Sequence, residues 1–203
     1  MHAVSTNKFI AVLGLILGVV AAPVWALAND ADGAVKFVRA TTEDFRVQFS
    51  RVEGEAEQRA LVDQTIAPHF DFDLVSRLVL GKYWRKTTAE QKLRITAALR
   101  ARVVNIYHGA LAGNKHFEIG YLGFRARENS KDVLVRTEVR RPEKPAFRVN
   151  YRMRRAGDEW KVVDVIVGGV SLVITHRKEF YEVIGSNGLD GLTRSLDSEL
   201  RGS

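Results

Sequence analysis

Two carboxylates stand close together in the sequence FDFD, residues 70–73, and this spacing suggests a cation site. A hard cation such as calcium needs six to eight oxygen ligands, and the next two residues are aliphatic. A short acidic side chain before an apolar periodic stretch is instead typical of a helix N-cap. We therefore predict that Asp73 caps a helix, that Phe70 and Phe72 belong to the core, and that no metal binds.

The histidines do not predict a metal site either. After residue 28 they are His69, His108, His116 and His176. No two of them have the i, i+4 spacing with which one helix presents two imidazoles to a zinc ion. We expect all four at the surface or at its boundary, with the run HRKE, residues 176–179, as a solvated helical turn.

The glycine pair in VGGVS, residues 167–171, resembles a phosphate-binding loop only superficially. Such loops have the spacing GxxxxGK[ST] or GxGxxG, and neither occurs here. Ser171 also lacks the GxSxG setting of a nucleophilic serine. We predict that the two glycines end a strand and that Ser171 caps the following helix.

A buried acid beside a tyrosine is the one arrangement that could support catalysis. Cone-shaped NTF2-like domains host isomerases and dehydratases with such a pair, and Asp164 and Tyr151 are the candidates here, with Tyr121 as a third. This enzyme hypothesis requires Asp164 to face the same cavity as the tyrosine. The alternative is that Asp164 binds backbone groups at the sheet edge. A binding adaptor without a ligand is a third functional class, beside a carrier and an enzyme.

The N-terminus predicts a secretory signal peptide over residues 1–28. Lys8 precedes an apolar run over residues 9–22, and Ala26-Leu27-Ala28 has the small-x-small pattern of a cleavage site. A membrane-spanning helix needs about 20 apolar residues, and Pro23 interrupts this run earlier. We expect one domain over residues 29–203 that is exported without a membrane anchor.

The composition favours a soluble domain with a core of its own and an anionic partner. The chain has no cysteine, so packing rather than disulfides must stabilise it. Its formal net charge of +7 suits nucleic acid, a phosphorylated lipid or an acidic protein surface. Export argues against nucleic acid, and so do the predicted strands, because Phe147 and Tyr151 alternate with Arg148 and Arg152 and fall on the opposite face from them.

Helices, strands and again helices follow one another along the chain. Apolar residues at intervals of three or four predict helices over 35–49, 56–66, 73–80 and 88–112, the last with Thr88 and Gln91 as a capping box. Alternation with period two then predicts strands near 117–128, 133–140, 147–154 and from Trp160. Helices return after Gly169 and after Gly188. This order predicts an α+β fold in which a curved four-stranded antiparallel sheet packs its apolar face on helices.

Three stretches resemble the MlaC family, also called toluene-tolerance auxiliary proteins. They are FDFDLVSRLVLGKYWRKTTAEQ (70–91), FRVNYRMRRAGDEWKVVDVIVGGVSLV (147–173), and the closing HRKEF and GLDGLTRSL. The likeness covers nearly the whole predicted mature chain. This chain departs from the family at His176, where an aromatic is usual, and at Leu93, Ile95 and Leu99, where the family has aromatics in the long helix.

The resemblance implies a periplasmic phospholipid carrier without catalytic activity. Its expected partners are phospholipid, an outer-membrane lipoprotein–porin complex, and the MCE-domain subunit of an inner-membrane ABC transporter. We expect a monomer with no cofactor, no metal and no nucleic acid. A carrier needs unreactive apolar walls, which explains the long, largely aliphatic stretch over residues 161–180.

The sequence also nominates residues for the two expected surfaces. Inward-facing apolar positions on the helices and strands are predicted to line a lipid pocket: Leu74, Leu78, Leu99, Val103, Tyr107, Val133, Val135, Val139, Phe147, Val149, Tyr151, Met153, Trp160, Val162, Ile166 and Leu172. Outward-facing strand arginines are predicted to dock on acidic partner surfaces: Arg136, Arg140, Arg148, Arg152 and Arg154.

Overall fold

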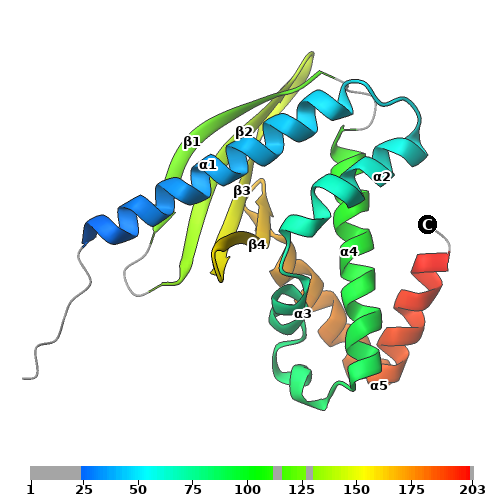
Figure 1. Ribbon diagram of the computed structural model, residues 1–203. Coiled ribbons are helices and arrows are strands. Elements are labelled where there is room, and N and C mark those ends of the chain that lie inside the picture. The colour runs from blue at the N-terminus through cyan, green and yellow to red at the C-terminus, as the bar shows by residue number, and fades with distance from the viewer. Residues whose placement is uncertain (1–23, 112–115, 127–129, 202–203) are drawn as a thin grey trace, which may run out of the picture.

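A computed structural model of the chain describes residues 24–111, 116–126 and 130–201, and between 24 and 30 it describes the backbone alone (Figure 1). The helices and strands follow in the order α1 (Val24–Phe49), α2 (Glu55–Thr65), η1 (Ala67–His69), α3 (Phe72–Leu80), η2 (Gly81–Lys86), α4 (Ala89–Leu111), β1 (Glu118–Ala126), β2 (Asp132–Arg141), β3 (Lys144–Ala156), β4 (Glu159–Val167), β5 (Val170–Ser171) and α5 (Leu172–Arg201). The predicted α+β class and the order helices, strands, helices are confirmed.

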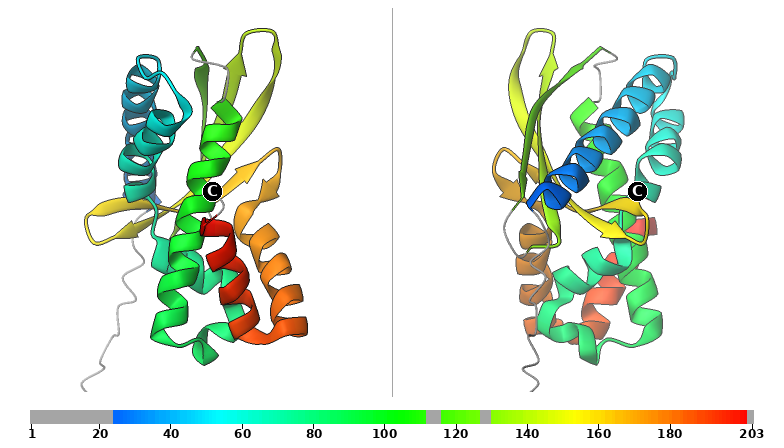
Figure 2. Two further views of the ribbon diagram at one scale, coloured as in Figure 1. Left: turned by 90° about the vertical axis from the view of Figure 1, so that its right-hand side faces the viewer. Right: turned by 60° about the vertical axis from the view of Figure 1, so that its left-hand side comes forward.

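The strands form one antiparallel meander in the order β1-β2-β3-β4-β5. Four of them are the predicted strands, and the fifth is only the pair Val170–Ser171. Gly157, in the turn between β3 and β4, and Gly168 and Gly169, in the turn between β4 and β5, have positive φ. Residues other than glycine adopt this conformation only at an energetic cost. The views in Figure 2 show the long β2–β3 hairpin curving away from the helices.

The two faces of the sheet differ in chemistry, as the alternation predicts. The inner face carries Val133, Val135, Thr137 and Val139 of β2, all of them buried. Helix α1 crosses this face and the C-terminal half of α4 approaches it (Figures 1 and 2). The outer face carries the intervening polar residues, which are half-buried or exposed.

Caps fix where three helices begin. The side chain of Asp71 accepts a hydrogen bond from the Leu74 amide at 2.9 Å, so Asp71 and not Asp73 is the N-cap of α3. The prediction was wrong by two positions, although Phe70 and Phe72 are buried as expected. Thr88 and Gln91 form the predicted reciprocal capping box, with hydrogen bonds of 2.9 and 3.2 Å.

The predicted cap at Ser171 is also present, since its Oγ accepts from the Ile174 amide at 3.1 Å. Helix α5, which starts there, is kinked at Gly188, where φ is 69°. Its two arms pack against α4, and the first arm also packs against α3 (Figure 1). The guanidinium of Arg102 on α4 joins the two arms, because it pairs with Glu179 and with Glu199, each at 2.7 Å.

The predicted signal peptide lies mostly outside the described residues, and its last part, residues 24–28, belongs to α1. Its cleavage after Ala28 stays a prediction. In the described part of the chain, every helix is too short or too polar to span a bilayer.

Candidate functional site

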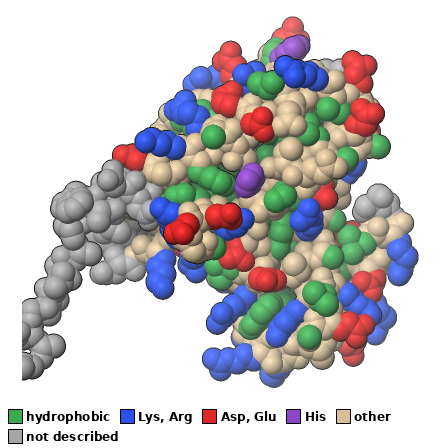
Figure 3. All heavy atoms as spheres, viewed as in Figure 1, with side chains coloured by type: hydrophobic (Ala, Val, Ile, Leu, Met, Phe, Trp, Pro, Cys, Tyr) green, Lys and Arg blue, Asp and Glu red, His purple; other side chains and the backbone are tan. Residues whose placement is uncertain are grey.

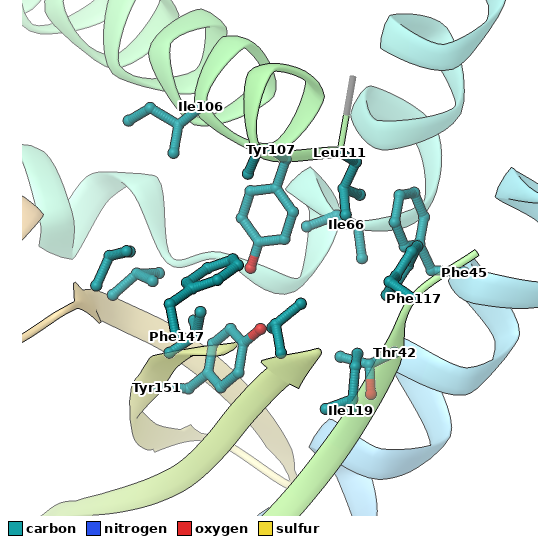
Figure 4. A pocket seen from close by; sticks show the side chains of 15 residues that line it. Thr42, Phe45, Ile66, Ile106, Tyr107, Leu111, Phe117, Ile119, Phe147 and Tyr151 are labelled. Carbon is teal, nitrogen blue, oxygen red and sulfur yellow. The ribbon is translucent and has the colours of Figure 1, made fainter. Parts of the chain in front are cut away.

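An apolar cavity lies at one end of the sheet, between its inner face and the helices (Figure 4). The centres of water-sized molecules have about 100 Å³ in it, and its atom-free space, part of which is open to solvent, measures about 650 Å³. The lining comes from α1, the end of α2, the last turns of α4 and four strands. The lining residues are Thr42, Phe45, Ile66, Ile106, Tyr107, Ala110, Leu111, Phe117, Ile119, Val139, Phe147, Val149, Tyr151, Val165 and Val167.

Periodicity explains why these positions meet. On α4, Tyr107 and Leu111 are four residues apart and therefore lie on one face of the helix. On β3, Phe147, Val149 and Tyr151 alternate with outward-facing residues, so that all three line the cavity. Figure 4 shows the rings of Phe147 and Tyr151 there.

The polar groups of the cavity are hydroxyls. The phenol oxygens of Tyr107 and Tyr151 face one another in Figure 4. Burial raises the pKa of Tyr151 to about 12 and the pKa of Tyr107 well above its usual value near 10. Both phenols are therefore neutral at physiological pH, and none of the 15 lining side chains is charged.

Five of the residues nominated as pocket lining are found on this cavity. They are Tyr107, Val139, Phe147, Val149 and Tyr151. Val162 lies on a void of about 20 Å³ that shares Tyr107 and Tyr151 with the cavity. Whether these residues contact lipid stays a prediction.

The other nominated residues lie elsewhere in the fold. Leu99, Val103 and Leu172 surround a separate void of about 20 Å³ between α3, α4, α5 and β4. Val133, Val135, Met153 and Trp160 are buried in the core, while Leu74 and Leu78 are half-buried on α3. Ile166 pairs with Asn150 and so faces outward, because its neighbours Val165 and Val167 line the cavity.

Ten lining residues were not nominated, although the sequence carried a signal for some. Phe45 and Thr42 belong to the predicted apolar stripe of the first helix, which was assigned only to packing. Ile119 lies on β1 and Phe117 directly precedes this strand, in which Gly120 and Gly123 obscured the alternation. His108 was expected at the surface or its boundary but is 5% exposed, so that prediction was wrong.

Asp164 does not line the cavity that contains Tyr151. Its carboxylate accepts the Ser171 hydroxyl at 2.6 Å and the Val173 amide at 3.1 Å, where β5 passes into α5. It also lies 3.7 Å from the Arg152 guanidinium, on the outer side. Asp164 therefore binds a backbone group at the sheet edge, which is the structural alternative given above. The enzyme hypothesis required this acid to face the same cavity as Tyr151, and Asp164 does not.

The five nominated arginines lie on the outer face, but four of them have partners within the chain. Arg154 pairs with Asp132 at 2.5 Å, and Arg152 lies between Asp132 and Asp164. The other two engaged arginines are Arg140, which pairs with Glu138 at 2.6 Å, and Arg136, which donates to the Leu122 carbonyl at 2.7 Å. Arg148 is exposed and has no ion pair or side-chain hydrogen bond within the described residues.

Helices that cover one face of an antiparallel sheet and enclose an uncharged apolar cavity define a binding domain for an apolar ligand. A family model described as MlaC protein matches residues 37–198, so the chain belongs to the MlaC family. The described residues contain no cluster of three or more metal-ligating side chains.

Two curated relatives and one solved structure are similar to this chain. Toluene tolerance protein ttg2D of Pseudomonas putida is 28% identical over 137 residues, which are 67% of this chain and 63% of the relative. The intermembrane phospholipid transport system binding protein MlaC of Haemophilus influenzae is 23% identical over 141 residues, which are 68% of this chain and 66% of the relative. A phospholipid-binding protein from Ralstonia solanacearum, solved in complex with a phospholipid, has a TM-score of 0.74 at 28% identity, over 81% of this chain and 95% of that one.

Proposed function

We propose that this protein is a periplasmic phospholipid carrier and not an enzyme. The observation that carries the proposal is the uncharged cavity between the inner sheet face and the helices. Its fold is similar to that of a protein solved with a phospholipid. The described residues bring no acid to Tyr151 in the cavity, which favours binding over catalysis.

The hydrophobic effect favours an apolar cavity wall for an acyl chain. Transfer of a methylene from water to an apolar site is worth about 0.8 kcal/mol, so a 16-carbon chain is worth about 12 kcal/mol. The donor membrane already supplies this energy, and the carrier needs only to match it. A water molecule needs about 10–15 Å³ of such space, so the cavity of about 100 Å³ admits about seven to ten waters, fewer than the methylenes of one 16-carbon chain. We therefore expect α1 and α4 to move apart from the sheet when an acyl chain enters.

The direct test is the lipid content of the purified protein. We expect mass spectrometry of protein made in a bacterial periplasm to find phospholipid that survives gel filtration. Delipidated protein should take up labelled phospholipid again from vesicles. A protein that arrives empty and takes up nothing from vesicles would refute the proposal.

The wider pathway belongs to the same proposal. The carrier would be exported by its signal peptide and would move lipid between an outer-membrane lipoprotein–porin complex and the MCE-domain subunit of an inner-membrane ABC transporter. Export is supported by the N-terminal pattern of residues 1–28, and the two partners by membership of the MlaC family. Acidic patches on these partners would meet the basic outer face of the sheet.

A substitution of Arg148 tests that docking surface most directly. Reversal of Arg152 would disturb Asp132 and Asp164, whereas Arg148 has no such partners in the described chain. We expect Arg148→Glu to slow association with the transporter subunit several-fold at low salt and less at high salt, because rim charges govern association rates. Surface plasmon resonance at two ionic strengths measures this.

The control for Arg148→Glu is Arg85→Glu, which changes the charge equally at an exposed position on η2. The lipid content of both variants should equal that of the wild type. Loss of lipid from Arg148→Glu with unchanged docking would show that Arg148 holds the headgroup instead.

A further inference from the structure

The inner face of β2 changes character at its last position. Thr137 and Val139 point inward, and the pairing with β3 is irregular between Val139 and Arg141. Beyond this irregularity the Arg141 side chain also turns toward the helices, since it reaches the Ala110 carbonyl on α4. The strand therefore brings a guanidinium to the border of the apolar cavity, two residues after Val139, which lines it. This residue was not nominated from the sequence.

Two contacts hold Arg141 against the cavity wall. Its Nη1 donates to the Ala110 carbonyl in the last turn of α4 at 3.0 Å. Its guanidinium carbon lies 4.8 Å from the centre of the Phe147 ring. Both Ala110 and Phe147 line the apolar cavity, so the guanidinium is anchored to two of its walls.

The hydrogen-bonding capacity of Arg141 is not used up by these contacts. Its Nε is buried and has no hydrogen-bond partner in the described part of the chain. No ion pair links it to a carboxylate there either. Its neighbours Arg46 and Arg140 differ in this respect, because they pair with Glu43 at 2.9 Å and with Glu138 at 2.6 Å.

A second, polar pocket of about 470 Å³ lies beside Arg141. Phe117 lines both this pocket and the apolar cavity, so the two spaces adjoin. Three arginines and a histidine face one glutamate in it, and the lining residues are Arg46, His116, Phe117, Glu118, Arg140, Arg141 and Pro142. A basic pocket against an apolar cavity matches an amphiphile with an anionic head.

We propose that this basic pocket binds the phosphate of the lipid whose acyl chains enter the cavity, with Arg141 as its principal ligand. The proposal rests on the proposed carrier function and assigns the headgroup to a specific place. A guanidinium can bind a phosphate with two parallel hydrogen bonds, and such charge-assisted bonds are about twice as strong as neutral ones. Arg141 is preorganised for this by Ala110 and Phe147.

The test compares two lipids that differ only in the phosphate. Delipidated full-length protein is mixed with phosphatidylcholine vesicles that carry either fluorescent phosphatidylglycerol or fluorescent diacylglycerol with the same chains. We expect Arg141→Gln to weaken phosphatidylglycerol binding about tenfold and to leave diacylglycerol binding within about twofold. Arg141→Lys should retain part of the preference, and Arg85→Gln, exposed on η2, should leave both unchanged.

The outcomes separate this proposal from the carrier function. Equal loss of both lipids in Arg141→Gln would show that Arg141 only supports the last turn of α4, and no loss of either would also overturn the proposal. Wild-type protein that binds both lipids equally would refute the phosphate site alone. Wild-type protein that binds neither would refute the carrier function itself, and the phosphate site with it.

Inorganic phosphate distinguishes a lipid headgroup from a free anion. The Nε–H signal of Arg141 in a nitrogen-15 spectrum can be assigned by its loss in Arg141→Gln. We expect it to shift when phosphatidylglycerol is added and to stay in place with inorganic phosphate alone. A full shift with inorganic phosphate, and none beyond it with lipid, would identify a free-anion site and overturn the proposal.

Discussion

Val149→Trp is expected to abolish most lipid binding while the protein stays folded. Val149 is 7% exposed, lies on the inner face of β3 and lines the cavity. An indole at this position would fill space that acyl methylenes need. Loss of contact with two or three methylenes costs about 2 kcal/mol, which is about a 30-fold weaker affinity. Uptake of fluorescent phosphatidylglycerol from vesicles measures the effect.

A matched control shows whether the loss of lipid binding depends on the position of the introduced tryptophan. Leu93→Trp introduces the same side chain at a position that is 72% exposed on α4, and it should bind lipid like the wild type. Overpacking of Val149→Trp costs about 1–3 kcal/mol, so circular dichroism should still show the native helix and sheet content. Normal lipid uptake by a folded Val149→Trp protein would place the acyl chains outside this cavity.

Local rules accounted for most of the fold. The capping box of Thr88 and Gln91, the glycine turn at Gly157 and the alternation along β2 and β3 each depend on a few neighbouring residues. Such signals are readable without tertiary context. The cap of α3 was misplaced because Asp71 and Asp73 offer the same side chain two positions apart, and only the backbone conformation decides between them.

The site was less predictable than the fold, because a side chain that faces inward need not line the cavity. Val135 and Val149 both point inward from neighbouring strands, at different levels of the sheet, yet only Val149 lines the cavity. The difference depends on how far α1 and α4 stand from the sheet at each level, which no local pattern encodes. Arg141 was not nominated for a related reason. Its proposed role depends on its tertiary contacts with Ala110 and Phe147 and on the adjoining pocket.

Phe180→Ala is expected to produce the largest loss of stability without loss of lipid binding. The Phe180 side chain is 0% exposed in the first arm of α5 and is absent from the lining of the cavity. Its ring lies 5.4 Å from the guanidinium carbon of Arg102, the residue that joins both arms of α5. Truncation of a buried phenylalanine costs about 3–5 kcal/mol, because the remaining cavity is only partly refilled.

For a domain of this size, such a loss lowers the melting temperature by roughly 6–20 °C. Thermal and urea unfolding of the delipidated protein measure it, so that bound lipid does not add to the apparent stability. Leu93→Ala, which truncates an exposed side chain, should change the free energy of unfolding by less than about 0.5 kcal/mol. Below its transition, Phe180→Ala should take up lipid like the wild type, whereas Val149→Trp should stay folded and empty. If Phe180→Ala lost lipid binding while folded, the cavity and the α5 packing would be one cooperative unit rather than two.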